Sequence, residues 1–300
     1  ESKSGERGIF NRNAAKKQVE KLGDRRNPDY NFGTNPCSEI ILRDKEFCNL
    51  TEVIIRPNDT PETLKEKVRL ATILGTWQAT LTDFRYLSKE WKNNCEEEAL
   101  LGVSLTGIMD NAYTNGTKEP KEWPLSGTLN YLKNIAIETN KKVAKQLGIN
   151  PAAAITCVKP SGTVSQLVDA SSGIHTRHSP FYIRTVRGDK KDPLCQFMVE
   201  KGIPHESDVT KPEHTWVFSF PIKTAKWAIC RNDKTAIEQL DFWKLYQEHW
   251  CEHKPSVTIT VKEEEWIEVG AWGFKNFDCV SGISFLPYAD HSYQQAPYQE

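Results

Sequence analysis

The sequence predicts an α/β fold, because short apolar segments typical of strands alternate with segments typical of helices. Strands are expected at 40–42, 152–158, 181–186, 215–221, 256–261 and 282–287. Helices are expected at 13–22, 96–111, 125–147, 192–201, 235–251 and 263–276, with a further helix that begins near residue 59. Strands separated by helices favour a mainly parallel sheet or a barrel. No internal repeat or clear linker interrupts the 300 residues, so a single domain is predicted.

The first forty residues contain the least regular structure. Residues 1–34 are rich in Gly, Asn, Arg and Lys and predict a loop with one short helix at Asn13–Leu22. Gly33 and Pro36 then flank the start of Asn35–Glu39, which predicts a turn that presents the thiol of Cys37. A short apolar strand, Ile40–Leu42, follows the turn.

The helix that begins at Asp59–Glu62 has the strongest start signal, a capping side chain followed by proline in the first turn. Its apolar residues recur at spacings of three and four, which predicts one buried stripe. The stripe comprises Leu64, Val68, Ala71, Leu74, Trp77, Leu81, Phe84 and Leu87. Gly148 is expected to close the helix at Leu125–Leu147.

Composition excludes several classes of protein. Lys and Arg number 39 against 40 Asp and Glu, so no one-signed field favours nucleic acid or a membrane surface. No signal peptide or apolar run of transmembrane length is present, which predicts a cytoplasmic protein with free thiols. Of the eight cysteines, four are expected to fill the core, namely Cys95, Cys157, Cys195 and Cys279.

Two cysteines eleven residues apart form the first candidate site. Asn35, Cys37 and Glu39 provide an amide, a thiol and a carboxylate within five positions, and Cys48 provides a second thiol. This set could carry out one-electron chemistry on a polyol, with hydrogen-atom transfer from the thiol and proton transfer to the carboxylate. The residues alone leave a second interpretation open, in which both thiols are inert and Asn35-Pro36 is an ordinary turn.

The second candidate is the turn after the expected strand at 152–158. Ser161, Gly162, Thr163 and Ser165 could direct backbone N–H groups and hydroxyls at a phosphate, although ordinary strand-to-helix turns use the same residues. The glycine spacing and lysine of a Walker loop are missing. A zinc site is the weakest alternative, because its spacing is unusual. Its ligands would be Cys230, His249, Cys251 and His253.

Five segments, in this order, resemble the catalytic domain of ribonucleotide reductases. They are Ser4–Arg12 (SGERGIFNR), Asn35–Ile40 (NPCSEI), Cys48–Leu50 (CNL), Pro160–Gln166 (PSGTVSQ) and Ser281–Tyr288 (SGISFLPY). The resemblance extends over essentially the whole chain. It points to the adenosylcobalamin-dependent (class II) branch, in particular its monomeric ribonucleoside-triphosphate reductases.

The resemblance implies a fold and a role for each site residue. The family fold is a ten-stranded α/β barrel with a central finger loop, and Gly33–Glu39 matches that loop. Cys37 would become a thiyl radical that removes hydrogen from C3′ of the ribose, and Glu39 would deprotonate the 3′-hydroxyl. Asn35 would hold the ribose hydroxyls, and Cys48 would be one of two reducing thiols. The turn at 161–165 would bind the substrate phosphates.

The same resemblance implies adenosylcobalamin as cofactor, a ribonucleoside triphosphate as substrate and a thioredoxin-like reductant. The compact spacing of Cys37 and Cys48 favours the cobalamin branch. Residues 290–298 lack the adjacent tyrosine pair of the iron-dependent branch, and no glycyl-radical motif occurs near the end. Two alternatives stay open. One is the large subunit of an iron-dependent (class I) enzyme, and the other is a catalytically dead nucleotide-binding fragment.

The chain also departs from the family pattern. The second reducing thiol and the allosteric loop of the family should lie upstream, but only thirty-six residues precede Cys37. The terminal cysteine pair of the family should lie beyond Glu300. We therefore expect the carboxyl-terminal half of the catalytic barrel, truncated at both ends and inactive without the missing upstream half of its own domain.

Overall fold

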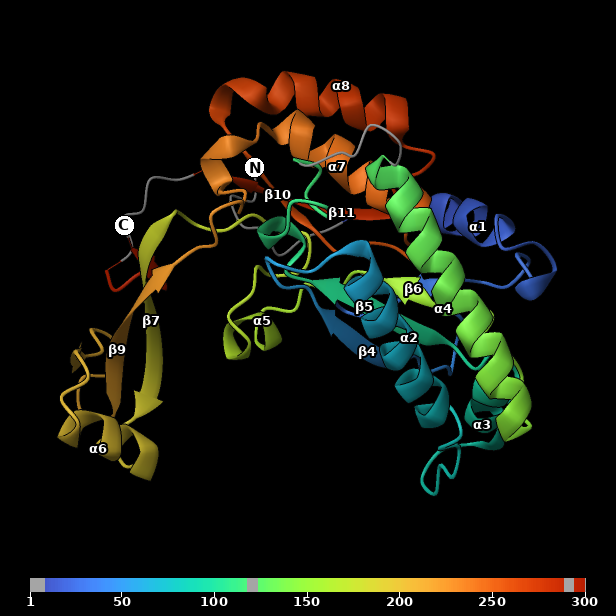
Figure 1. The fold of residues 1–300 in the computed structure, drawn as a ribbon, viewed down its shortest axis with the longest axis horizontal. Coiled ribbons are helices and arrows are strands. Elements are labelled where there is room, and N and C mark those ends of the chain that lie inside the picture. Colours follow the sequence, from blue (N-terminus) through green and yellow to red (C-terminus); the bar gives the residue numbers. More distant parts are fainter. Residues whose placement is uncertain (1–8, 118–123, 289–293, 300) are drawn as a thin grey trace.

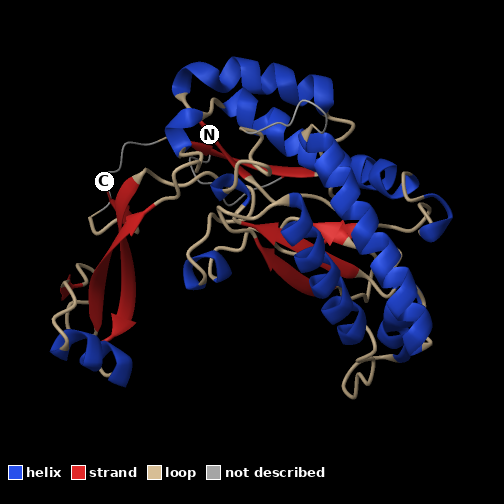
Figure 2. Cartoon of the chain, in the orientation of Figure 1, coloured by secondary structure: helices blue, strands red, loops and turns tan. Residues whose placement is uncertain are grey.

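The computed structural model describes residues 9–117, 124–288 and 294–299. Helices surround the central strands, with α7 and α8 on one side and α2 and α4 on another (Figures 1 and 2). The helices are α1 Arg12–Glu20, α2 Pro61–Gln78, α3 Lys89–Glu98, α4 Leu125–Leu147, α5 Val164–Leu167, α6 Pro193–Glu200, α7 Ala236–His249 and α8 Trp266–Asn276. The first six strands are β1 Ile9–Phe10, β2 Gly33–Thr34, β3 Ile41–Leu42, β4 Asn49–Ile54, β5 Leu101–Thr106 and β6 Thr156–Cys157. The remaining strands are β7 Phe181–Asp189, β8 His205–Ser207, β9 Thr215–Lys223, β10 Thr258–Val261, β11 Gly282–Pro287 and β12 Tyr298–Gln299.

Parallel strands form the centre of the molecule, which confirms the α/β prediction. β4 pairs with β5 and β5 with β6, both in parallel. A parallel bridge between Val158 and Pro255 then joins the end of β6 to the segment that continues into β10. β10 pairs in parallel with β11, and β1 adds an antiparallel edge. Five parallel strands therefore follow one another through the ladder and the bridge.

Residues 181–223 form an antiparallel sheet, so the prediction of a mainly parallel sheet is wrong for this region. β12, β7, β9 and β8 pair in that order, and Figure 1 shows β7, β9 and α6 projecting from the main body. The connecting helix α6 has eight residues, about 12 Å of length. Since β7 has nine residues and is about 30 Å long, α6 is too short for a parallel crossover.

The helix predicted at 96–111 is also wrong. Helix α3 ends at Glu98, Ala99 adopts the left-handed conformation with φ 43°, and strand β5 follows. All six residues of β5 are buried; α2 packs on one side of the sheet, and β4 and β6 flank the strand. A strand buried on both faces has a continuous apolar sequence, which periodicity does not distinguish from a buried helix.

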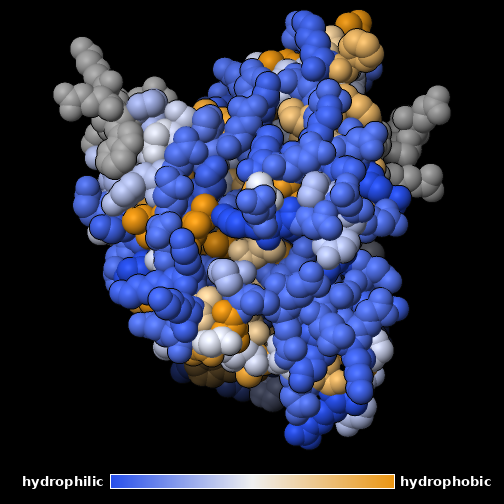
Figure 3. Space-filling view, turned by 90° about the vertical axis from the view of Figure 1, so that its right-hand side faces the viewer, coloured by the Kyte–Doolittle hydropathy of each residue, from blue (hydrophilic) through white to orange (hydrophobic). Residues whose placement is uncertain are grey.

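The predicted stripe of the helix at α2 is correct for its first half only. Leu64, Val68 and Ala71 are buried against the core, but four later members of the stripe are exposed. These are Leu74, Trp77, Leu81 and Leu87, with 56, 55, 72 and 41% of their surface exposed. The helix ends at Gln78, so the last positions do not share its face. The side of the molecule with α2, α3 and α4 is largely polar with small apolar patches (Figure 3).

The other expected helices are confirmed to within a few residues. Gly148 closes α4 with φ 69°, as its position predicts. The expected strand at 152–158 is shorter than predicted, because only Thr156 and Cys157 form a ladder with β5. Among the described helices, none combines the length and the apolar character needed to cross a membrane.

Candidate active site

The loop between β2 and β3 holds Cys37 in a turn closed by the side chain of Asn35. Pairing of Thr34 with Ile41 brings the two ends of the loop together. The carboxamide oxygen of Asn35 accepts a hydrogen bond from the Ile40 N–H at 3.0 Å, and its carbonyl accepts from the Ser38 N–H at 2.9 Å. Ser38 has φ 65°, which reverses the chain between Cys37 and Glu39. The Asn35 side chain therefore shapes the turn.

Cys37 and Glu39 lie in opposite environments. Cys37 is an exposed free thiol, whereas Glu39 has 2% of its surface exposed. Partial burial and the Glu39 carboxylate raise the pKa of the Cys37 thiol, and Lys159 lowers it to a smaller extent. The thiol is therefore protonated at neutral pH. Among the described residues, Glu39 Oε2 has no hydrogen-bond partner although it is buried.

The segment before β10 holds the turn at Asn35–Glu39 through hydrogen bonds. Lys254 is fully buried, and its ammonium donates hydrogen bonds to Ser38 Oγ at 2.7 Å and to the Gly282 carbonyl at 2.9 Å. The Lys254 N–H donates to the Glu39 carbonyl at 3.2 Å, and Ser256 Oγ donates to the Cys37 carbonyl at 2.7 Å. The turn is thus attached to the segment that leads into the parallel strand β10.

Cys48 lies directly before β4, where it packs against β5. It is half-buried, and burial raises the pKa of its thiol well above the ordinary value. A Cβ atom added to Gly102 would lie 3.2 Å from Cys48 Sγ and 2.4 Å from Leu50 Cδ2. Glycine at this position of β5 therefore makes room for the Cys48 side chain.

The turn predicted to bind phosphate follows β6 and leads into α5. Ser161 adopts φ 51°, and Gly162 and Thr163 are exposed. The backbone N–H groups of Gly162 and Thr163 donate no hydrogen bond to any described residue. In contrast, Ser165 is fully buried, with its hydroxyl 3.1 Å from Ser172 Oγ. Helix α5 has four residues, so its dipole adds little at this turn.

Two charged residues, Glu52 and Lys159, interact electrostatically with groups of the Cys37 turn. Glu52 on β4 accepts a hydrogen bond from Ser161 Oγ, and its second carboxylate oxygen is buried with no partner in the described part of the chain. Burial raises the pKa of Glu52, Lys159 lowers it, and Glu39 raises it. Because Lys159 also acts on Cys37, the two turns share one electrostatic environment. The sequence analysis did not identify Glu52, Lys159 or Lys254; for Glu52 and Lys159 the available signal was a charged residue within or directly after an apolar segment.

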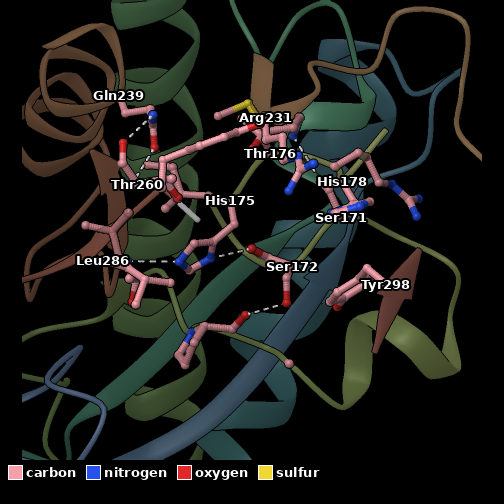
Figure 4. Close-up of a pocket in the computed structure, with 18 of the residues that line it drawn as sticks. Ser171, Ser172, His175, Thr176, His178, Arg231, Gln239, Thr260, Leu286 and Tyr298 are labelled. Atoms are coloured by element: carbon pink, nitrogen blue, oxygen red, sulfur yellow. Dashed lines mark hydrogen bonds between the residues drawn. The ribbon is translucent and has the colours of Figure 1, made fainter. Parts of the chain in front are cut away.

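A cavity of about 1050 Å³ opens beside the turn at 161–165. Its lining includes Gly162, His175, Thr258 and Tyr288. His175 Nε2 accepts from the Thr258 N–H at 3.0 Å, so its Nδ1 carries hydrogen and donates to the Ser172 carbonyl at 2.9 Å (Figure 4). Burial lowers the pKa of His175, in agreement with a neutral ring.

The alternative zinc ligands do not form a site in the described part of the chain, where no three His, Cys, Asp or Glu side chains are placed to bind a metal. His253 instead accepts from the Ile41 N–H at 3.3 Å and lies 3.0 Å from the Leu101 carbonyl. Burial lowers the pKa of His253 to about 3. The four cysteines expected to fill the core are free thiols; Cys95, Cys157 and Cys195 are buried and Cys279 is half-buried.

No family model matches the chain, but curated proteins similar to it are described as adenosylcobalamin-dependent ribonucleoside-triphosphate reductases. An adenosylcobalamin-dependent ribonucleoside-triphosphate reductase of Euglena gracilis is 29% identical over 282 residues, which is 91% of this chain and 37% of that protein. A reductase of the same description from Lactobacillus gasseri is 30% identical over 291 residues, 88% of this chain and 38% of that protein. The crystal structure of a B12-dependent (class II) ribonucleotide reductase matches with a TM-score of 0.77 and 27% identity. The chain is a homologue of these reductases.

The structural match covers 89% of this chain and 40% of the class II enzyme. The class Id ribonucleotide reductase alpha subunit of Actinobacillus ureae shares the fold, with a TM-score of 0.57, 14% identity and coverage of 95% of this chain and 59% of that one. The chain spans less than two fifths of the length of the curated relatives named above. Homology to class II reductases confirms the resemblance inferred from the sequence. Of the segments that carried it, Ser4–Gly8 lies outside the described residues.

Proposed function

We propose that this chain forms the carboxyl-terminal half of the catalytic domain of an adenosylcobalamin-dependent ribonucleoside-triphosphate reductase. The observation that carries the proposal is the juxtaposition of Cys37 and Glu39. An exposed, protonated thiol lies two residues from a buried carboxylate, beside a turn with free amides. The homology described above supplies the reaction class.

The strand order supports the proposed barrel. Five parallel strands in succession would form one half of a ten-stranded barrel, and a second half would cover their open edge at β4. The β2–β3 loop would be the finger loop that carries Cys37. Within this proposal, residues 1–300 belong to a single catalytic domain.

The protonation state of Cys37 suits hydrogen-atom transfer. A thiol can give up a hydrogen atom, whereas a thiolate has none to give, and the raised pKa of Cys37 keeps the hydrogen on sulfur. The sulfur radical would then remove hydrogen from C3′ of the ribose. Glu39 would accept the proton of the 3′-hydroxyl, and the 2′-hydroxyl would take a proton from one of the reducing thiols and leave as water.

Asn35 and Cys48 would complete the reaction. The oxygen of the Asn35 carboxamide is already bound to the Ile40 N–H, so its NH₂ group would donate to the ribose hydroxyls. Cys48, with a second thiol, would supply two electrons and end as a disulfide. A dithiol protein of the thioredoxin type would restore the thiols.

The cavity and the two turns provide side chains and amides suited to the proposed cofactor and substrate. When bound, adenosylcobalamin supplies a carbon radical that takes the hydrogen atom of a thiol, and the exposed Cys37 thiol is open to it. Flat rings of the cofactor would be held by the aromatic side chains of the cavity, Phe285, Tyr288 and Tyr298. The amides of Gly162 and Thr163 and the hydroxyls of Ser161 and Ser165 are the proposed phosphate donors, although Ser165 would have to break its contact with Ser172.

The test is reduction of CTP by the protein that carries this chain with its flanking segments. Dithiothreitol serves as reductant, and the assay is run with and without adenosylcobalamin. We expect deoxycytidine triphosphate only with the cofactor, and none from the Cys37→Ser variant. The Cys195→Ser variant, which alters a buried thiol on α6, is the matched control and should retain activity.

Product that forms only with an added iron-containing subunit would replace the cobalamin branch with the class I alternative. Nucleotide binding without product under either condition would favour the catalytically dead fragment. Product from the Cys37→Ser variant would remove the radical role of Cys37.

A further inference from the structure

The hydroxyl hydrogen of Ser161 is bound to a carboxylate and is not free for a phosphate. Ser161 Oγ donates this hydrogen to Glu52 Oε1. A hydroxyl has one hydrogen, so it cannot donate to Glu52 and to a phosphate oxygen at the same time. Ser161 directly precedes the amides of Gly162 and Thr163, which donate to no described residue. A phosphate that engages all three groups therefore requires Glu52 to give up the hydrogen bond that it accepts.

Glu52 faces the turn because of its position on β4. The preceding residue, Thr51, faces α2, where its Cγ2 would lie 3.5 Å from a Cβ atom added to Gly75. Successive side chains of a strand point to opposite faces, so Glu52 lies on the face away from α2. Ser104 pairs with Glu52 on β5, and its Oγ accepts from the Lys159 N–H at 2.9 Å. The segment that leads into the turn is therefore held beside Glu52 by β5.

A charged Glu52 is unfavourable next to a bound phosphate. Its Oε2 is buried and has no hydrogen-bond partner among the described residues. A buried oxygen without a partner is costlier on a carboxylate than on a neutral carboxyl group. Burial already raises the pKa of Glu52, Lys159 lowers it, and Glu39 from the β2–β3 loop raises it. A phosphate at the neighbouring amides would add a further negative charge and favour the protonated form.

We propose that binding of a triphosphate transfers a proton from solvent to Glu52, and that Ser161 then donates its hydrogen to a phosphate oxygen. The new O–H of Glu52 donates to a lone pair of Ser161 Oγ, so the two side chains stay hydrogen-bonded with the direction of the bond reversed. One O–H bond forms, and solvent supplies the proton. The inference rests on the function proposed above for the identity of the ligand. It makes the affinity for substrate decrease as the pH rises.

Proton uptake can be measured by isothermal titration calorimetry of the full-length protein with CTP, slightly above pH 7, in buffers that differ in ionisation enthalpy. For each CTP bound, the wild type should take up about 0.3 to 1 proton more than Glu52→Gln. Ionisation of CTP itself contributes equally to both proteins and cancels in the difference. Glu39→Gln is the matched control. It removes the neighbouring buried carboxylate, whose Oε2 has no partner among the described residues, and should retain the uptake.

The affinity of Glu52→Gln distinguishes a proton acceptor from a residue that only holds the turn. The amide of a glutamine can donate to Ser161 Oγ, as a protonated carboxyl does. At about pH 8, Glu52→Gln should therefore bind CTP about threefold or more tightly than the wild type. In that background, Ser161→Ala should weaken binding about tenfold. Weaker binding by Glu52→Gln than by the wild type would overturn the proposal, and so would equal proton uptake by these two proteins.

A second measurement uses the wild type alone and covers the case in which the variants fail to fold. The ligand is inorganic triphosphate, which lacks the base and the ribose. The infrared difference spectrum between bound and free protein should gain a protonated carboxyl band and lose a carboxylate band. A spectrum without this exchange would overturn the proposal. Failure of CTP reduction with proton uptake intact would refute only the proposed function, whereas reduction with equal uptake by wild type and Glu52→Gln would refute only the role of Glu52.

Discussion

The two turns of the candidate site are built in opposite ways. The turn at Asn35–Glu39 is attached at its Asn35, Cys37, Ser38 and Glu39 positions to side chains or backbone of the core. The turn at Ser161–Thr163 leaves two exposed amides without a partner among the described residues. A group that transfers hydrogen must be held at a fixed position, whereas a turn that binds an anion must keep its donors free. Under the proposed function, this difference matches reaction at the first turn and phosphate binding at the second.

The largest expected effect concerns the reacting turn. Glu39→Gln keeps the shape of the side chain but removes the base, and should lower kcat of CTP reduction about 10²- to 10⁴-fold. The Kd for CTP should stay within about twofold, because the free amides lie on the other turn. Equilibrium binding and initial rates measured together would test whether reaction and CTP binding depend on different turns. A large loss of CTP affinity with kcat retained would contradict it.

A substitution in the turn at Ser161–Thr163 should instead change the affinity for CTP. Thr163→Pro removes one free N–H, and should weaken CTP binding about tenfold or more, since hydrogen bonds to charged groups contribute about 1.5–3 kcal/mol. Thr163→Ala retains the N–H and is the control, with an affinity close to wild type. Calorimetric titration with CTP measures both. Equal losses in the two variants would show that the side chain, and not the amide, binds.

Packing beneath the two turns should also differ. Gly102→Ala places a methyl group against Leu50, Ile40 and Cys48, and should lower the free energy of unfolding by about 1–3 kcal/mol. Gly162→Ala adds its methyl group to open space and should change the stability by less than about 0.5 kcal/mol. Urea unfolding of both variants compares the two sites. A neutral Gly102→Ala would mean that β4 shifts to accommodate the methyl group.

The last prediction is a pH dependence from Lys254. Its pKa is about 7 in the folded protein, below that of an exposed lysine at about 10.4, so the unfolded chain binds more protons between these values. The free energy of unfolding should therefore rise with pH across this range, by up to about 1.4 kcal/mol per pH unit. Lys254→Met should flatten the rise, as measured by urea unfolding at several pH values. An unchanged slope would assign the pH dependence to other groups.

Several features of the fold followed from local sequence alone. The limits of α4 and α7 depend on caps and apolar spacing close in sequence, such as Gly148 and Thr235, and these were predicted to within two residues. β5 was predicted as a helix because the partners that bury both faces of this strand lie far away in the chain. The exposed half of the α2 stripe has the same origin, since burial depends on what packs against a helix and not on the helix itself.

The sequence by itself determined the chemistry that is available here: a thiol, a carboxylate and an amide within five positions, and a turn of small residues. Only the tertiary structure decided the burial, the exposure and the contacts of these groups. It buries Glu39 and leaves Cys37 exposed, turns Glu52 from β4 toward Ser161, and places Lys254 beneath Ser38 from more than two hundred residues away. The physical reason is that burial, field and free hydrogen-bond donors arise from neighbours in space, which a local pattern does not encode.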